Sequence, residues 1–156
     1  MNRTGSKRLG IIFLLSLWMG LLACYSSPRV IISTKSGKEL VLKVEVADTP
    51  AKRELGLQYR RELGEDQGML FLFPFEGVQS FWMKNTPLPL DMIFIGSDLR
   101  IVGIIHQAVP FSTTSQSVSA PSRFVLEVQG GLSRQKGIEA GNSVRFEGVS
   151  LDGVRE

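Results

Sequence analysis

Short alternating segments separated by turn residues most constrain what this chain can fold into. In residues 40–46, leucine and valine recur at every second position, which is the period of a half-buried β-strand. Further strands are expected at 30–34, 68–73, 78–84, 91–95, 100–108, 123–129 and 143–151. A series of short strands at regular intervals favours a mainly β fold, a compact single domain of sandwich or barrel type.

Turn and helix signals connect these segments. The sequence Lys-Ser-Gly-Lys at 35–38 predicts a hairpin between the first two strands. Asp48-Thr49-Pro50 is typical of a helix start, so we expect a helix over 51–59 and a second short helix near 132–136. We expect Pro74 to end the strand at 68–73. In the strand at 123–129, we expect three residues to face the core: Phe124, Leu126 and Val128.

The N-terminal residues have the pattern of a secretory signal. Arg3, Lys7 and Arg8 stand in a segment without acids, and residues 11–22 (IIFLLSLWMGLL) form an unbroken apolar run. A membrane-spanning helix needs about 20 apolar residues, more than this run provides. We therefore expect residues 1–23 to be a signal peptide, with an uncleaved N-terminal anchor as the alternative.

The residues that follow the apolar run resemble a bacterial lipobox, Leu21-Leu22-Ala23-Cys24. The resemblance implies that Cys24 is lipidated and anchors the chain to a membrane of the bacterial cell envelope. Residues 24–28 would then be a short tether and residues 29–156 the domain. A secreted protein with a free thiol is the alternative. Because this is the single cysteine of the chain, its lipidation would exclude disulfides and cysteine-based zinc sites.

Cleavage of the signal would also change the charge of the protein. The chain has 18 basic and 15 acidic residues; three of the basic ones lie in residues 1–23, so 15 of each remain. A neutral domain without runs of like charge gives no indication of nucleic-acid binding. One histidine and dispersed carboxylates provide no metal-ligand spacing. We expect neither a metal nor a cofactor.

Four segments resemble the DUF192 family of small bacterial and archaeal proteins: VEVADTPAKRELGLQYRREL, GMLFLFPF, FWMKNTPLPLDMIFIGSDLRIV and FVLEVQGGLSRQKGIEAGNSV. The resemblance spans about residues 44–144. It implies a compact, mainly β domain of sandwich type that is often exported, and it supplies no catalytic assignment. Two departures stand out. The loop at 110–121, where members often carry cysteines, has none here, and Gly141-Asn142 replaces the usual Gly-Asp.

Residues 80–94 (SFWMKNTPLPLDMIF) hold the candidate site. Alternation places Phe81 and Met83 on one side of the expected strand, toward the core, and Trp82 and Lys84 on the other. An exposed indole beside an ammonium group suits the stacking of sugars or planar ligands. The alternative is that Trp82 covers the edge of the fold while Lys84 reaches water.

Two prolines make the rest of this stretch stiff, which would hold Asn85 and Asp91 in place for a ligand. Both side chains could instead bond to backbone groups of the turn. Arg60, after the first helix, could supply an anion contact at the same rim or belong to a solvated charged surface together with Arg61 and Glu62. The candidate ligand-binding residues are Trp82, Lys84, Asn85, Asp91 and Arg60.

Three functions remain open. The first is a lipid-anchored envelope protein that binds a small molecule, a glycan or an envelope partner protein at these residues. The second is an envelope hydrolase acting on a wall or sugar substrate, with Asp91 as acid or base; Glu76 is available as a second carboxylate, without a motif. His106 and the serines of 112–119 lack the G-x-S-x-G element of serine hydrolases. The third is a purely structural envelope component.

Overall fold

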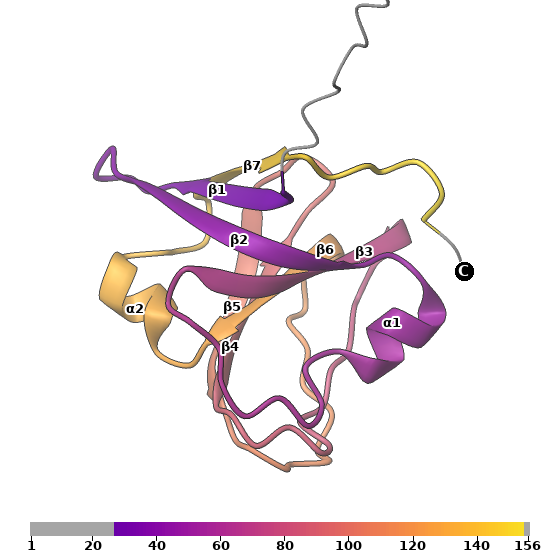
Figure 1. The fold of residues 1–156 in the computed structure, drawn as a ribbon. Coiled ribbons are helices and arrows are strands. Elements are labelled where there is room, and N and C mark those ends of the chain that lie inside the picture. The colour runs from indigo at the N-terminus through magenta and orange to yellow at the C-terminus, as the bar shows by residue number, and fades with distance from the viewer. Residues whose placement is uncertain (1–26, 155–156) are drawn as a thin grey trace, which may run out of the picture.

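The computed structural model describes residues 27–154, so the expected signal peptide and Cys24 lie outside the described residues. The described chain is a mainly β single domain, as the alternation predicted (Figure 1). Its elements are β1 (Arg29–Ser33), β2 (Glu39–Ala47), α1 (Pro50–Leu55), β3 (Gln67–Gly77), β4 (Leu90–Ile95), β5 (Ile101–Ala108), β6 (Ser122–Gln129), α2 (Leu132–Lys136) and β7 (Ser143–Glu147).

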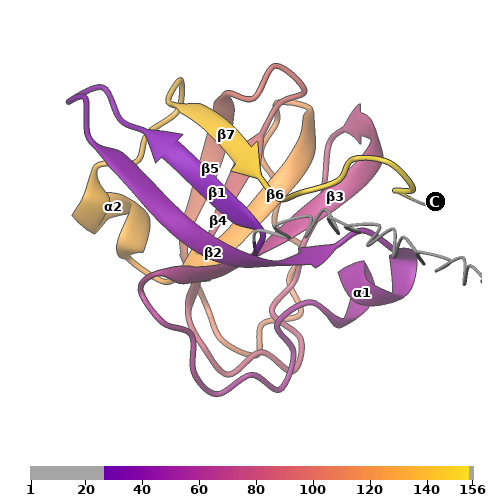
Figure 2. The same ribbon diagram turned by 45° about the horizontal axis from the view of Figure 1, so that its top comes forward.

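The strands form one curled sheet in the order β5-β4-β6-β3-β2-β1-β7. Among the strands of residues 27–154, only β2 and β3 pair in parallel, and the connection between them contains α1; the other pairs are antiparallel. The two ends of the sheet meet, because Ile101 N donates to Asn142 O at 3.0 Å and Val144 N donates to Leu99 O at 2.8 Å. The sequence predicted either a sandwich or a barrel. The single curled sheet is the barrel-like alternative, a half-barrel. Figure 2 shows β1, β2 and β7 side by side at one edge.

Both faces of the central strands are buried. One apolar cluster fills the inside of the curl and includes Leu70, Ile93 and Leu126. A second cluster lies on the outer face of β3, β6 and β4, where the segments after α1 and before β4 cover it, and includes Phe71 and Phe94. This second core explains why β4 is buried at every position and why the outward side of β6 is buried as well as the predicted inward one.

The first half of the domain confirms the local turn signals. β1 and β2 pair as a hairpin, with Ser33 opposite Glu39. Helix α1 begins with Pro50 after the N-cap Thr49, whose side chain accepts a hydrogen bond from Lys52 N. The helix ends at Leu55, earlier than expected, because Gly56 leaves the helical conformation with φ 47°. A Cβ at this glycine would lie 3.3 Å from the Phe71 ring, so the absence of a side chain lets the turn pack on the sheet.

Three other expectations were wrong. β3 continues through Pro74 to Gly77, because its pairing with β6 is interrupted between Leu72 and Gly77 and no ladder donor is needed there. The stretch 78–84 is not a strand; within it, only Phe81 makes an isolated bridge, to Gln116. The last strand ends at Glu147 instead of residue 151. No helix among residues 27–154 is long and apolar enough to cross a membrane.

Candidate functional site

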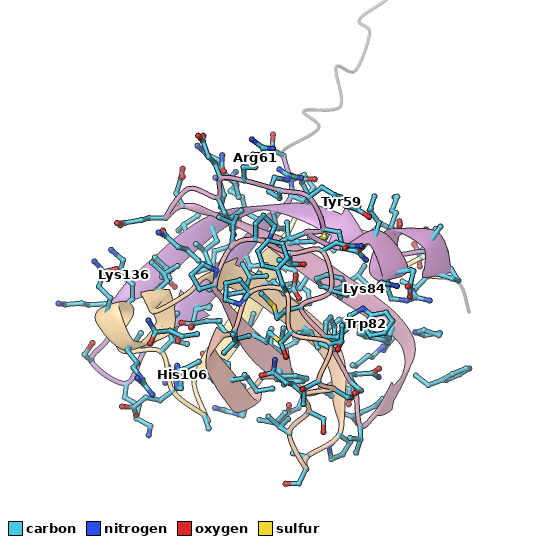
Figure 3. The ribbon with its side chains drawn as sticks, turned by 90° about the horizontal axis from the view of Figure 1, so that it is seen from below. Tyr59, Arg61, Trp82, Lys84, His106 and Lys136 are labelled. Atoms are coloured by element: carbon cyan, nitrogen blue, oxygen red, sulfur yellow. The ribbon has the colours of Figure 1, made fainter. Side chains whose placement is uncertain are left out.

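Of the candidate residues, Trp82 and Lys84 lie at the end of the domain where the loops between strands meet (Figure 3). There the stretch before β4 runs beside the loop at 110–121. Phe81 and Gln116 exchange backbone hydrogen bonds of 2.9 and 2.7 Å, and Met83 N donates to Ser112 O at 2.8 Å. The hydroxyls of Ser80 and Ser115 also bond to each other. These hydrogen bonds fix the loop at 110–121, which has no cysteines that could form a disulfide.

The face prediction for this stretch is confirmed although it is not a strand. Met83 is fully buried and Phe81 is partly buried, whereas Trp82 is 43% exposed and Lys84 is exposed. Lys84 Nζ lies 5.1 Å from the centre of the Trp82 ring, a cation–π contact. The two side chains that were predicted to form a surface do lie together, as Figure 3 shows.

A groove of about 530 Å³ runs between α1 with its following turn on one side and the Ser80–Thr86 stretch on the other. We call it the Trp82 groove. Its apolar lining is Leu55, Leu57, Phe71, Phe73, Phe81 and Trp82 together with Pro50 and Gly56, and its polar lining is Arg53, Glu54, Gln58, Ser80, Thr86 and Ser115.

Edge-to-face contacts organise the aromatic lining of the groove. The Phe81 ring lies 5.0 Å from that of Phe71, at an interplanar angle of 89°, and 6.2 Å from that of Phe73. Arg53 stacks over Phe73 at 5.3 Å and donates to Leu72 O at 2.9 Å. The aromatic side chains of the groove are therefore held in place by the sheet beneath them.

Asn85 lies at the boundary of the Trp82 groove. Its amide nitrogen donates to Gln58 Oε1 at 3.1 Å and to Tyr59 OH at 2.8 Å. Asn85 itself has a left-handed backbone with φ 54°, a conformation that asparagine adopts more readily than most residues. Its amide therefore joins the turn after α1 to the proline-rich stretch, and it lines a second recess rather than the Trp82 groove.

Asp91 is separated from the other candidates because it is completely buried in β4. One carboxylate oxygen accepts from Gln107 N at 2.8 Å and Gly131 N at 2.9 Å; the other accepts from Ser133 N at 2.9 Å and from the Ser133 hydroxyl. Burial by itself raises the pKa of Asp91, but the hydrogen bonds from Gly131, Ser133 and Gln107 outweigh it and leave the pKa below its ordinary value. The carboxylate ties β4 to the end of β5 and the start of α2.

Ser133 also contacts the single histidine of the chain. Its hydroxyl, which donates its hydrogen to Asp91, lies 2.9 Å from His106 Nδ1 and therefore accepts a hydrogen bond from that nitrogen. A serine nucleophile needs the opposite arrangement, with the histidine accepting the hydroxyl proton. Ser133 is moreover fully buried. The three side chains form a structural network, and sequence reasoning did not single out Ser133 because its partners are distant along the chain.

The remaining charged residues considered from the sequence lie in three separate places. Arg60 forms an ion pair of 2.8 Å with Glu45 on β2 and does not line the Trp82 groove. Its neighbour Arg61 lines the second recess instead. Glu76 accepts from Ser97 N and Oγ, each at 2.8 Å, and so supports the turn between β4 and β5. Among residues 27–154, no three His, Cys, Asp or Glu side chains are grouped so that they could hold a metal ion.

The fold and the groove define a small single-domain β protein with a ligand-sized, aromatic-lined groove at its loop end. The model of the DUF192 family, described as "Uncharacterized ACR, COG1430", matches residues 31–146, so the chain belongs to this family. The search of curated proteins found no match.

Two crystal structures are similar to this chain along most of its length. A protein of unknown function from Novosphingobium aromaticivorans DSM 12444 is 40% identical, with a TM-score of 0.73, over 75% of this chain and 83% of the other. A protein from Sinorhizobium meliloti 1021 described as a "putative transcription regulator" is 41% identical, with a TM-score of 0.75, over 80% of this chain and 97% of the other.

Proposed function

We propose that this protein is a lipid-anchored component of the bacterial cell envelope whose domain binds a small molecule or a glycan in the Trp82 groove. The observation that carries the proposal is the composition of that groove, about 530 Å³ in volume, with an aromatic floor and a polar rim. Ligand sites typically combine a mostly apolar concave surface with a few polar groups that set orientation.

The rim of the groove favours a hydroxyl-rich ligand. The face of a sugar ring can stack on the exposed indole of Trp82, while its hydroxyl groups bond to side chains such as Glu54 and Ser80. Lys84, over the Trp82 ring at 5.1 Å, supports the orientation of the indole. A glycan of the cell wall is therefore the ligand class that this surface suits best, and an envelope partner protein is an outcome that the experiment below would reveal.

The lipid anchor rests on the sequence Leu21-Leu22-Ala23-Cys24 that follows the apolar run. Two or more acyl chains on one cysteine would anchor the chain stably, because each buried CH₂ contributes about 0.8 kcal/mol. Cys24→Ser, or globomycin treatment of cells, is expected to leave an unprocessed precursor on an immunoblot. Normal maturation of the Cys24→Ser chain would refute the anchor without affecting the groove.

The groove is tested by binding of the full chain, extracted in mild detergent, to purified peptidoglycan and to its soluble fragments. Trp82→Ala should weaken binding about tenfold, as expected when an aromatic anchor is truncated. Phe75→Ala is the matched control, since Phe75 is an aromatic residue that is 70% exposed and does not line the groove. Equal binding by both variants and the wild type would refute the proposal.

The two alternatives differ from this proposal in measurable ways. For a hydrolase with Asp91 as acid or base, the carboxylate would have to reach a substrate, yet it is fully buried and accepts four hydrogen bonds; no observation favours this function. For a purely structural component, Trp82→Ala would lower the melting temperature and leave every binding measurement unchanged. Regulation of transcription, as named for the Sinorhizobium protein, has no support in a domain with balanced charge.

A further inference from the structure

A second hollow, of about 440 Å³, lies beside the Trp82 groove and shares no lining residue with it. We call it the Tyr59 recess. It is lined by residues from three separate loops, namely Tyr59, Arg61, Asn85, Pro87, Leu88 and Phe111. The loops meet through backbone hydrogen bonds, from Tyr59 N to Asn85 O at 2.7 Å and from Phe111 N to Thr86 O at 3.1 Å.

Three residues of this recess have a left-handed backbone, which is strained in the two bulky ones, Tyr59 and Phe111. Tyr59, Asn85 and Phe111 have φ values of 62°, 54° and 60°, in the left-handed region. For a bulky side chain this conformation is uncommon, and each such residue costs about 1–3 kcal/mol. The hydrogen bonds between the loops hold all three in place. Strain of this kind collects at ligand sites, where it orients side chains that contribute little to folding.

The two aromatic side chains gain little packing in return for this strain. Tyr59 is 69% exposed and Phe111 is 64% exposed. Neither belongs to the two apolar cores of the domain. Both residues therefore lower the stability of the fold in two ways, through backbone strain and through apolar surface that stays exposed to water. The result of this arrangement is a recess with aromatic walls.

The recess also contains a cation without an internal partner. Arg61 is exposed and forms no ion pair or hydrogen bond with any residue in the part of the chain that the structure describes. Its neighbour Arg60 is paired with Glu45 at 2.8 Å. Glu62 does not line the Tyr59 recess; it lines an adjoining hollow of about 290 Å³, which shares Arg61 and Leu88 with the recess. The charge offered to a molecule in the Tyr59 recess is therefore positive.

The polar groups beside Arg61 fit the same kind of ligand. Tyr59 OH accepts a hydrogen bond from Asn85 at 2.8 Å, so the hydrogen of the phenol is left to donate. Both amide hydrogens of Asn85 are used, one by Gln58 and one by Tyr59, which fixes the phenol in position. A guanidinium and a phenol O–H are donors that a carboxylate accepts well.

From these observations we propose that the Tyr59 recess binds a small organic anion, an aromatic or otherwise apolar group that carries a carboxylate. The apolar part packs against Phe111, Leu88 and the Tyr59 ring, and the carboxylate bonds to Arg61 and to Tyr59 OH. This site is independent of the glycan proposed for the Trp82 groove, because the two hollows have different linings.

The probe for this site is 4-fluorophenylacetate, observed by ¹⁹F NMR line broadening with the full chain in lipid nanodiscs. Its uncharged counterpart, 4-fluorophenylacetamide, has nearly the same shape, and empty nanodiscs correct for partition into lipid. The acid should bind about tenfold more tightly than the amide, since a charge-assisted contact contributes about that much. Failure of the acid to bind, or equal binding of acid and amide, would overturn the proposal.

Two neighbouring arginines provide a matched pair of variants. Arg61→Gln should reduce binding of the acid about tenfold and leave binding of the amide unchanged. Arg60→Gln, which removes an equal charge one residue away, should leave both unchanged because Arg60 faces Glu45. Equal effects of the two variants would show only a general charge effect and would overturn the proposal. Trp82→Ala should not alter binding of the acid, so failure here is distinguishable from failure of the glycan proposal.

Discussion

Glu127 offers the sharpest test of how this domain is packed. It lies on β6 between Met69 of β3 and Met92 of β4, which are its partners across the two ladders. The residue is only 4% exposed, and within residues 27–154 its side chain has no hydrogen bond or ion pair that would offset this burial. Burial in this apolar setting raises the pKa of Glu127 from 4.5 to about 8.

The raised pKa makes stability depend on pH in a defined direction. Between pH 4.5 and about 8 the folded state keeps the Glu127 proton that the unfolded state has lost, so the free energy of unfolding falls as the pH rises through this range. Below 4.5 the contribution is fully present, and it is lost as the pH passes about 8. At about 1.4 kcal/mol per pKa unit, the loss between about pH 5 and pH 7.5 is about 3 kcal/mol.

Glu127→Gln keeps the size of the side chain and removes its titration. The free energy of unfolding of the full chain would be measured by urea denaturation, followed by circular dichroism, at several pH values in one detergent. The advantage of the variant over the wild type should grow by about 3 kcal/mol from about pH 5 to pH 7.5. Parallel pH profiles for the two proteins would refute the argument, whatever their absolute stabilities, because the cost of burying an amide is the same at both pH values.

The remaining predictions concern the other buried carboxylate and the strained aromatic residue. Asp91→Asn should destabilise the protein by about 3 kcal/mol, because an amide NH₂ then faces backbone donors; urea denaturation should give the same loss at pH 5 and pH 7.5, since the lowered pKa of Asp91 leaves it ionised at both. In the wild type, the contribution of the ionised Asp91 carboxylate to the free energy of unfolding should be lost only as the pH falls below about 3.8. A loss of this contribution that begins above pH 5 would contradict the lowered pKa of Asp91. Phe111→Asn should raise the free energy of unfolding by about 1 kcal/mol by relieving left-handed strain and abolish binding of 4-fluorophenylacetate; a destabilised variant that still binds would contradict both expectations.

Much of the fold could be predicted because its signals are local. The β1–β2 hairpin, the Pro50 helix start and the strand positions each depend on residues within a few positions of one another. The limits of these elements were less predictable. Helix α1 stops at Leu55 because the turn after it packs on Phe71, which lies on another strand. The stretch 78–84 alternates like a strand, but its neighbour is an irregular loop that offers only one bridge, at Gln116.

The candidate site was predictable where it depends on alternation. Trp82 and Lys84 were placed correctly on the exposed side, and Met83 on the buried side. Asp91 and Arg60 were less predictable, because their roles depend on partners far along the chain. The carboxylate of Asp91 bonds to backbone groups 16 to 42 residues away, and Arg60 pairs with a residue on β2.

The order of residues alone was sufficient for the fold class, the family and the exposed Trp82 and Lys84, because alternation and turn chemistry act over short distances. Packing in three dimensions was required for the rest. The second core buries the outward side of β6, so that Glu127 sits in an apolar site although it lies on the side opposite the predicted core residues Phe124, Leu126 and Val128. Likewise, the Tyr59 recess exists only where three loops meet. Its left-handed backbone conformations are held by hydrogen bonds between segments that the sequence keeps far apart.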